Sequence, residues 1–410
     1  MEYGLIGERL SHSHSPQIHR MLGDYAYELM PMPPEEIEGF LTRADFKGIN
    51  ITIPYKRTVI PFCRTLDRFA ERTGSVNTIV KDKDGLLHGF NTDYSGFLFM
   101  ARRAGISFKG EKVLIFGSGG TGHTAQAVAE DEGALSVVTV SRTGPDNYEN
   151  LARHRDSTLI INTTPVGMFP KNSDSLINLS RFPLLRGVID VVYNPLSTRL
   201  ILQAKELGLA CTGGFPMLVA QGVFASGHFQ NREFSDVVIE DVTERMTGML
   251  SNLVLIGMPG SGKTTFARLA AEKLGRVMID IDDAIEKKAG MGIQEIFEKQ
   301  GEASFRLLEK DVIEETGRLN GLVIATGGGC VLLRENGLNL KQNGVLIYLD
   351  RETNDLAIDG RPLSTDLETL AFMRRHREPL YNKFADFTVK NNSDEKEVLF
   401  RILDAFGGAK

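Results

Sequence analysis

Two glycine-rich loops, each directly after a short apolar stretch, constrain this chain more than any other feature. The first, Gly117-Ser-Gly-Gly-Thr-Gly122, has the spacing G-x-G-x-x-G and follows Lys112–Phe116. The second, Gly257-Met-Pro-Gly-Ser-Gly-Lys-Thr264, has the P-loop pattern and follows Leu253–Ile256. Both loops present backbone N–H groups at the start of a helix, where phosphate groups bind. The first spacing is typical of a dinucleotide site and the second of a nucleoside triphosphate site. The sequence therefore predicts a redox site and a phosphoryl-transfer site in one polypeptide.

Strand-like and helix-like segments alternate along the chain, which predicts an α/β fold with parallel sheets. We expect strands at 48–53, 112–116, 136–140, 159–162 and 188–192, and then at 253–256, 277–280, 322–325 and 345–349. A charged amphipathic helix is expected over 236–246, followed by a helix stop. We therefore place the main domain boundary near Gly248, with domains at 1–248 and 249–410.

Composition narrows the class of protein. A chain of 410 residues exceeds one ordinary core, and 42% apolar with 24% charged residues is typical of a soluble globular protein. The net charge of −6, the lack of a long apolar run and the lack of a secretory leader predict a cytoplasmic protein without nucleic-acid or membrane partners. We expect small-molecule substrates, and nothing in the sequence fixes an oligomeric state. The three cysteines are scattered without metal-ligand spacing and are interpreted as reduced packing residues.

The segment after the 136–140 strand indicates which dinucleotide is bound. An NAD site would place an acidic residue there for the ribose hydroxyls, whereas Arg142 offers a cation for a 2′-phosphate. The sequence thus favours NADP(H), and a surface arginine is the alternative interpretation. The expected cofactor contacts from these two segments are Gly117, Ser118, Gly119, Gly120, Thr121, Gly122, Ser141, Arg142 and Thr143.

Two charged residues at the edges of apolar segments are candidate catalytic groups. Lys56 follows the 48–53 strand, and Asp93 lies in Asn91-Thr-Asp93. Brought together, they could protonate a carbonyl oxygen as hydride reaches its carbon; solvated surface charges are the alternative. Ser13 and Ser15 precede a proline-initiated helix and form a candidate carboxylate cradle, or else a helix cap.

Residues 1 to about 247 resemble shikimate dehydrogenase over their whole length. The matching motifs are Ser13-His-Ser15-Pro16, Asn50-Ile-Thr52-Ile-Pro-Tyr-Lys56, Ser75-Val-Asn77-Thr78, Asn91-Thr-Asp93, Asn162-Thr-Thr-Pro-Val-Gly-Met168, Asp190-Val-Val-Tyr193-Asn-Pro195 and Gly214-Phe-Pro-Met217-Leu-Val-Ala-Gln221. The resemblance implies a substrate-binding part at about 1–100 and 210–247 and a Rossmann-like NADP-binding part at about 101–209. Pro216 stands where the family usually has glycine.

The same resemblance implies the reaction and further site residues. It implies NADPH-dependent reduction of 3-dehydroshikimate to shikimate, with Lys56 as the main proton donor and Asp93 as its partner. Arg142 argues against the related enzymes that use NAD. The resemblance adds Thr52, Asn77, Tyr193 and Gln221 as substrate contacts, and Val191, Gly214 and Met217 as cofactor contacts.

The P-loop predicts how ATP and its metal ion are held. The loop amides would cradle the phosphates, Lys263 would neutralise the transferred group, and Thr264 would bind Mg²⁺. Asp280 and Asp282 follow the next strand on one face, where one could hold the metal and the other orient or deprotonate an acceptor hydroxyl. We expect Asp280 to be the metal ligand, together with Thr264, and Asp282 to be the catalytic group. A helix N-cap pair is the alternative. The remaining loop residues expected to contact ATP are Gly260, Ser261, Gly262 and Thr265.

Two arginines select an acceptor that carries a carboxylate. Arg306 lies on a helix-like stretch, and Arg377 lies in Arg374-Arg-His-Arg377. Two guanidinium forks that converge on one pocket suit a carboxylate, although each alone is more often a surface charge. Gly327-Gly-Gly329 would let a substrate approach the backbone closely.

Residues from about 252 to 405 resemble shikimate kinase. By this resemblance Asp282, Arg306, Gly328 and Arg377 hold shikimate, and Arg361 is the lid arginine that closes over the phosphates. The lid at 350–361 is shorter than the family usually shows. The sequence thus predicts a fused enzyme for two consecutive steps. The alternative is an active dehydrogenase whose P-loop domain only senses nucleotide or phosphorylates another small acid.

Overall fold

A computed structural model describes residues 2–10, 13–356 and 367–408 of the chain. Its contacts divide the chain into two compact units. The first unit comprises Met1–Met168, Ser175–Asn194 and Gln203–Glu244, and the second comprises Phe169–Asp174, Pro195–Leu202 and Arg245–Lys410. The charged helix expected over 236–246 is α8 (Asp236–Leu250), which continues through Gly248.

The first unit contains two sheets. Its N-terminal sheet is mixed, with the order β2 (Tyr27–Pro31), β1 (Tyr3–Gly7), β3 (Gly48–Ile51), β5 (Thr78–Lys81), β6 (Leu87–Phe90) and β4 (Thr65–Leu66). Strands β1, β2 and β3 run parallel, whereas β5 pairs antiparallel with β3 and β6. The helices of this part are α1 (Ser15–Leu22), α2 (Ile37–Arg43) and α3 (Arg68–Thr73). The antiparallel pairs lie outside the purely parallel pattern that the sequence predicts.

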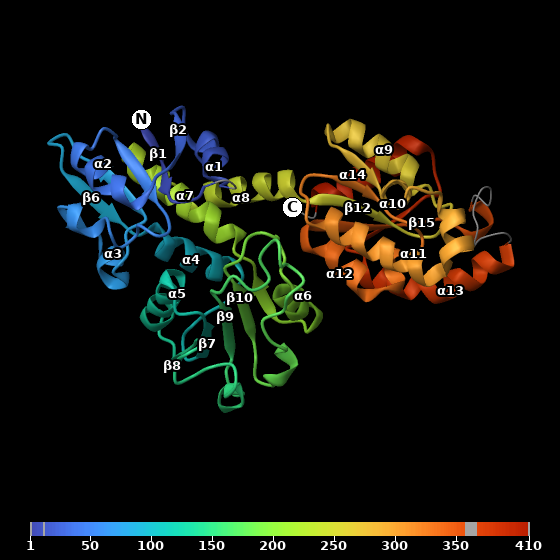
Figure 1. Ribbon diagram of the computed structural model, residues 1–410, viewed down its shortest axis with the longest axis horizontal. Coiled ribbons are helices and arrows are strands. Elements are labelled where there is room, and N and C mark those ends of the chain that lie inside the picture. The colour runs from blue at the N-terminus through green and yellow to red at the C-terminus, as the bar shows by residue number, and fades with distance from the viewer. Residues whose placement is uncertain (1, 11–12, 357–366, 409–410) are drawn as a thin grey trace. The chain divides into compact units, whose positions relative to one another are not determined.

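The second sheet of this unit is entirely parallel. Its order is β11 (Ala210–Thr212), β10 (Gly187–Asp190), β9 (Leu159–Asn162), β7 (Lys112–Phe116) and β8 (Ser136–Val140). Helix α5 (Gly120–Asp131) belongs to this part, and the division between the two units falls within α6 (Arg199–Glu206), after Leu202. Helices α4 (Thr92–Arg103) and α7 (Phe215–Gln230) lie against each other between the two sheets (Figure 1). Phe97 and Met217, from α4 and α7, join the buried core against β7 and β9. The carboxyl ends of these parallel strands are where α/β sheets bind ligands.

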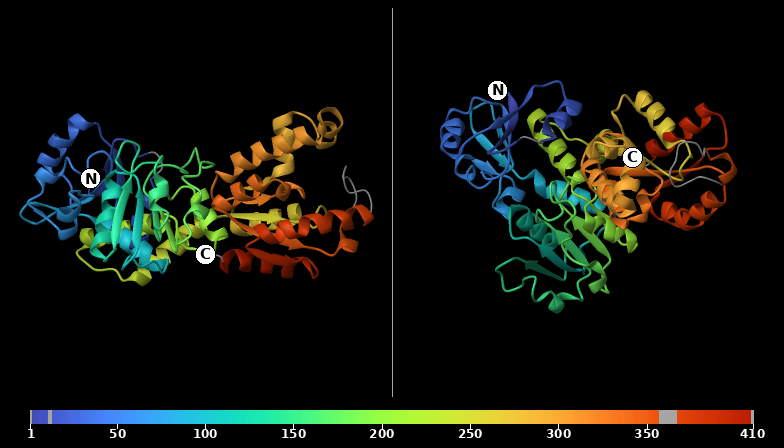
Figure 2. Two further views of the ribbon diagram at one scale, coloured as in Figure 1. Left: turned by 90° about the horizontal axis from the view of Figure 1, so that it is seen from below. Right: turned by 45° about the vertical axis from the view of Figure 1, so that its right-hand side comes forward.

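The second unit is a five-stranded parallel sheet with helices on both faces (Figure 2). The strand order is β13 (Met278–Asp280), β14 (Val323–Ala325), β12 (Asn252–Ile256), β15 (Gly344–Asp350) and β16 (Phe387–Lys390). One face is covered by α9 (Lys263–Leu274) and α14 (Glu395–Gly408). The other is covered by α10 (Ile281–Ala289), α11 (Ile293–Gly317), α12 (Arg334–Asn343) and α13 (Leu367–Phe384). The predicted α/β fold with parallel sheets is confirmed.

Among the described residues, no helix is long and apolar enough to cross a membrane.

Candidate active sites

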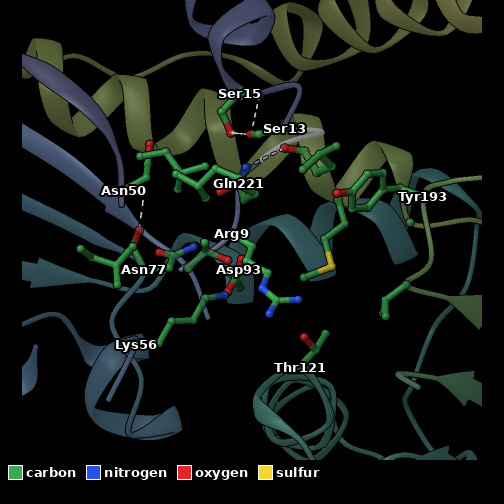
Figure 3. A pocket seen from close by; sticks show the side chains of 18 residues that line it. Arg9, Ser13, Ser15, Asn50, Lys56, Asn77, Asp93, Thr121, Tyr193 and Gln221 are labelled. Atoms are coloured by element: carbon green, nitrogen blue, oxygen red, sulfur yellow. Dashed lines mark hydrogen bonds and ion pairs between the residues drawn. The ribbon is translucent and has the colours of Figure 1, made fainter. Parts of the chain in front are cut away.

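A cavity of about 380 Å³ in the first unit gathers the predicted substrate residues (Figure 3). They come from the start of α1, the end of β3, the β3–β5 connection, the loop after β10, and α7. All six line this cavity: Ser13, Ser15, Thr52, Asn77, Tyr193 and Gln221. Segments far apart in the sequence thus present hydroxyls and amides to one small polar space.

The candidate proton donor lies in the same cavity. Lys56 Nζ lies 2.6 Å from Asp93 Oδ2, with the two side chains 24% and 15% exposed. The helix that carries Asp93 is held in place because Asn91 caps α4, its side chain accepting from the Tyr94 N–H. The pair is therefore a positioned ammonium–carboxylate contact, and the interpretation of two solvated surface charges does not describe it.

The neighbouring polar groups are fixed by hydrogen bonds. Asn77 is 3% exposed, and its amide donates to Thr92 Oγ1 while its carbonyl accepts from the Thr92 N–H. Ser13 Oγ donates to Ser15 Oγ at 3.1 Å, and no side chain among the described residues caps α1. Burial raises the pKa of Tyr193, which keeps this hydroxyl protonated as a donor. These contacts pre-position the lining groups.

The dinucleotide loop forms the turn between β7 and α5, as its spacing predicts. Four of the expected cofactor contacts line the same cavity: Thr121, Val191, Gly214 and Met217. A Cβ atom added at Gly119 or Gly120 would meet nothing within 4 Å, so the start of α5 is open to a ligand. An added Cβ at Gly122 would instead collide with the carbonyl oxygen of Gly117, so this glycine serves the packing of the turn. The turn thus fits a bound diphosphate, which needs backbone amides within reach.

The other predicted cofactor residues lie around this turn. Gly117 donates its N–H to the carbonyl of Val140, which joins the loop to β8, and Ser118 lies within the same turn. After β8, Ser141 Oγ accepts from the Gly144 N–H at 2.9 Å, while the side chains of Arg142 and Thr143 are exposed. Arg142 is therefore free of burial at the end of β8, where a 2′-phosphate would lie.

A cavity of about 560 Å³ in the second unit gathers the P-loop and the acceptor residues. Most of the predicted ATP and shikimate contacts line it: Gly260, Gly262, Lys263, Thr264, Thr265, Asp282, Arg306, Gly328 and Arg377. Ser261 is a fully buried member of the loop, and no hydrogen bond from the described residues reaches its hydroxyl. The expected lid residue Arg361 lies outside the described residues.

The predicted metal-binding pair is in contact. Thr264 Oγ1 donates to Asp280 Oδ2 at 2.8 Å, and Asp280 Oδ1 also accepts from the Asp282 N–H. Asp280 is therefore the N-cap of α10 and at the same time a neighbour of the P-loop hydroxyl. A hydroxyl and a carboxylate oxygen are the ligands that Mg²⁺ takes beside nucleotide phosphates.

The two arginines of the acceptor pocket are both held by protein groups. Arg306 Nη1 lies 2.9 Å from Glu309 Oε2, and Arg377 Nη1 donates to the carbonyl of Gly328 at 3.2 Å. Glu309 is fully buried, and burial raises its pKa while the Arg306 guanidinium opposes that rise. Sequence reasoning missed Glu309, although its spacing three residues after Arg306 places both on one helix face.

The three consecutive glycines of this pocket have a packing role. An added Cβ at Gly327 would lie 2.7 Å from Asp282 Oδ1, and one at Gly328 would lie 2.6 Å from Pro259. A Cβ at Gly329 would collide with the Arg306 guanidinium. The turn is therefore glycine-rich because three parts of the site pack directly on its backbone, in addition to any close approach of substrate.

Comparison with known proteins decides the family of the first unit. A shikimate dehydrogenase (NADP⁺) of Clostridium perfringens is 33% identical over 265 residues, which cover 60% of this chain and 97% of that protein. The family model "Shikimate dehydrogenase substrate binding domain" matches residues 5–79. The chain belongs to the shikimate dehydrogenase family. Its predicted membership is confirmed, and with it the use of NADP(H).

Solved structures agree with this placement. A chorismate mutase/shikimate 5-dehydrogenase fusion protein from Clostridium acetobutylicum has a TM-score of 0.56 at 29% identity, covering 60% of this chain and 96% of that chain. Shikimate 5-dehydrogenase from Thermus thermophilus, solved in complex with NADP(H) and shikimate, has a TM-score of 0.54 at 30% identity, covering 60% and 99%.

The second unit matches another family. The family model "Shikimate kinase" matches residues 259–406, from the P-loop through most of α14. The shikimate dehydrogenase of this chain is thus fused to a shikimate kinase domain, and the chain is a bifunctional enzyme of the shikimate pathway.

Proposed function

We propose that the two cavities carry out consecutive reactions on one ring. The first reduces the carbonyl of 3-dehydroshikimate to the hydroxyl of shikimate, and the second transfers a phosphoryl group from Mg-ATP to that hydroxyl. We assign the dehydrogenase to residues 1–248 and the kinase to 249–410, in a cytoplasmic enzyme. The substrate-binding part would comprise about 1–100 and 210–247, and the NADP-binding part about 101–209.

The observation that carries the first reaction is the Lys56–Asp93 contact inside the polar cavity. When bound, NADPH would supply hydride to the carbonyl carbon, and the oxygen would then need one proton. Lys56 holds that proton on Nζ, while Asp93 fixes the ammonium group and stabilises its charge. Ser13 and Ser15 would hold the ring carboxylate, and Asn77, Thr52, Tyr193 and Gln221 the rest of the ring.

The observation that carries the second reaction is the shared cavity of Lys263, Asp282 and the two arginines. Arg306 and Arg377 would bind the ring carboxylate, and Asp282 would orient the 3-hydroxyl toward the γ-phosphorus. As the oxygen–phosphorus bond forms, the bond to ADP breaks, and Lys263 stabilises the charge on the transferred group. Thr264 and Asp280 would hold the Mg²⁺ ion.

A one-pot assay tests both reactions. The purified full chain is mixed with 3-dehydroshikimate, NADPH, ATP and Mg²⁺, and products are followed by mass. We expect shikimate 3-phosphate to form, shikimate alone to form without ATP, and no product without NADPH. Shikimate accumulating in the complete mixture would contradict the kinase assignment, and would favour the nucleotide-sensor alternative. Gluconate offered as acceptor tests the other alternative, and its phosphorylation in preference to shikimate would change the substrate.

A further inference from the structure

Arg9 is a charged residue of the first cavity that the proposed function does not yet use. It lies between β1 and α1, and its side chain lines the same cavity as Lys56, Asp93 and Thr121. Figure 3 shows the guanidinium extending past the Lys56–Asp93 pair toward Thr121, on the side of the cavity away from Ser13 and Ser15. Within the part of the chain that the structure describes, no hydrogen bond or ion pair holds this guanidinium.

The exposed side chain of Arg9 extends toward a second source of positive charge, the start of α5. Thr121 belongs to the first turn of α5, whose free N–H groups and macrodipole place partial positive charge at this end of the helix. A guanidinium that extends toward this end therefore meets charge of its own sign. The space at Gly119 and Gly120 is open, with no atom within 4 Å of an added Cβ. An anion between the guanidinium and the helix start would satisfy both groups.

The available anions can be told apart by position. The ring carboxylate is served by Ser13 and Ser15 on the opposite side of the cavity, and the 2′-phosphate by Arg142 beyond β8. The anion that belongs beside the start of α5 is the diphosphate of the dinucleotide. Its nicotinamide-side phosphate must lie nearest the reacting groups, because the nicotinamide ring has to reach the substrate carbonyl near Lys56.

We propose that Arg9 binds the nicotinamide-side phosphate of NADP(H). This inference rests on the dehydrogenase site described above. A guanidinium can bind two phosphate oxygens at once, which fixes the direction of the diphosphate as well as holding its charge. Arg9 comes from the β1–α1 segment and the loop amides from the β7–α5 turn, so the cofactor would be held from both walls of the cavity.

A binding experiment with two ligands tests the role of Arg9. Dissociation constants of the full chain are measured by fluorescence titration for NADPH and by competition for 2′,5′-ADP, which has the 2′-phosphate but no nicotinamide-side phosphate. For Arg9→Gln we expect about tenfold weaker NADPH binding, because a charge-assisted hydrogen bond is lost, and unchanged binding of 2′,5′-ADP. Arg9→Lys keeps the charge without the fork, so its loss should be smaller.

Two matched variants serve as controls. Arg142→Gln should weaken both ligands, because the 2′-phosphate is common to them. Arg20→Gln removes the same charge from an exposed position on α1 outside the cavity, and should change neither.

Unchanged NADPH binding by Arg9→Gln would overturn the proposal. So would a raised KM for 3-dehydroshikimate at an unchanged NADPH dissociation constant, because Arg9 would then serve the substrate. Failure of the unmodified chain to bind NADPH would instead overturn the dehydrogenase site itself, and the proposal with it.

Discussion

The two phosphate loops of this chain both follow buried strands, yet they differ in the groups that they offer to the negative charge of a phosphate. The β7–α5 loop contains no charged side chain, and its ligand-facing glycines are open. In the P-loop, Lys263 is buried, and its Nζ donates to the carbonyls of Gly257 and Met258 at 3.0 and 2.9 Å. The dinucleotide loop therefore offers an anion only backbone amides and a helix end, whereas the P-loop also contains a cation.

This difference says where each site is vulnerable. A neutral loop is damaged most by atoms that fill its open space, since amides and the helix end do the binding there. A loop with a built-in cation is damaged most by loss of that cation, because the lysine would hold the phosphates and stabilise the charge on the transferred group. Changes in one unit should leave the chemistry of the other intact.

The largest expected effect is in the kinase. Lys263→Met removes the ammonium group that would stabilise the transferred phosphoryl, so kcat should fall on the order of 10³-fold. Formation of shikimate 3-phosphate from added shikimate, followed by mass, measures this. NADPH oxidation by the same protein should stay at the normal rate, and its loss would contradict the independence of the two sites.

The matching change in the dehydrogenase is Lys56→Met. Reduction of 3-dehydroshikimate should slow on the order of 10²-fold, because the positioned proton donor is gone while the hydride donor still binds. The rate of NADPH oxidation and the NADPH dissociation constant are measured together. A normal reduction rate would show that another group supplies the proton. Phosphorylation of shikimate is the internal control and should not change.

The two kinds of glycine in the first loop should separate binding from folding. Gly122→Ala places a Cβ against the Gly117 carbonyl and should destabilise the first unit by about 2 kcal/mol. Gly119→Ala fills only open space, so it should leave stability unchanged and weaken NADPH binding about tenfold. Urea unfolding curves and NADPH titrations of both variants provide the measurement. Equal destabilisation by the two substitutions would contradict the open-space interpretation.

The smallest expected effect is on the pH dependence of stability in the first unit, and it comes from the buried histidine His19. His19 is fully buried and stacks on Tyr27 at 3.9 Å, and burial lowers its pKa from 6.5 to about 3. The native state keeps His19 neutral, whereas the unfolded chain protonates it below about pH 6.5. The stability that the folded state gains by keeping His19 neutral is therefore complete above that pH, and it is lost as pH falls toward 3. In the second unit, burial raises the pKa of Glu309, so this group has the opposite effect on the pH dependence of stability. Its contribution to the stability of the folded state is lost as pH rises.

The test compares urea midpoints for loss of NADPH binding at two pH values. From about pH 7.5 to about pH 5.5, His19 should cost the first unit about 1.4 kcal/mol. His19→Gln should reduce the pH dependence by that amount. Equal pH dependence of the His19 variant and the unmodified chain would contradict this role.

The features predicted well from the sequence are those that motif spacing fixes. A glycine loop needs a strand before it and a helix after it, so β7, α5, β12 and α9 could be placed from the sequence. The parallel strands β8, β9, β10, β14 and β15 are apolar runs typical of buried sheets, and they too were predictable. The motifs of the first half also contain the residues that the structure gathers into one cavity, although their roles stay predictions.

The features that sequence reasoning missed depend on distant partners. The edge strand β2 has mostly exposed residues and lacks the apolar run of a central strand, and β5 with β6 forms an antiparallel pair inside a mixed sheet. Glu309 is buried, and its charge partner Arg306 lies beside it in the pocket. The sequence gives no sign that Arg9 differs from an ordinary surface charge, and only the folded structure shows that it lines the cavity. Such properties arise from contacts between segments and leave no local pattern.

The glycine turn of the kinase pocket also has a consequence for inhibitor resistance. Its backbone packs on Asp282, Pro259 and Arg306, so a side chain at any of the three positions displaces a part of the site. A compound that hydrogen-bonds to the peptide groups of this turn would therefore contact a surface that single substitutions cannot reshape without also damaging catalysis. Resistance would have to arise elsewhere in the pocket.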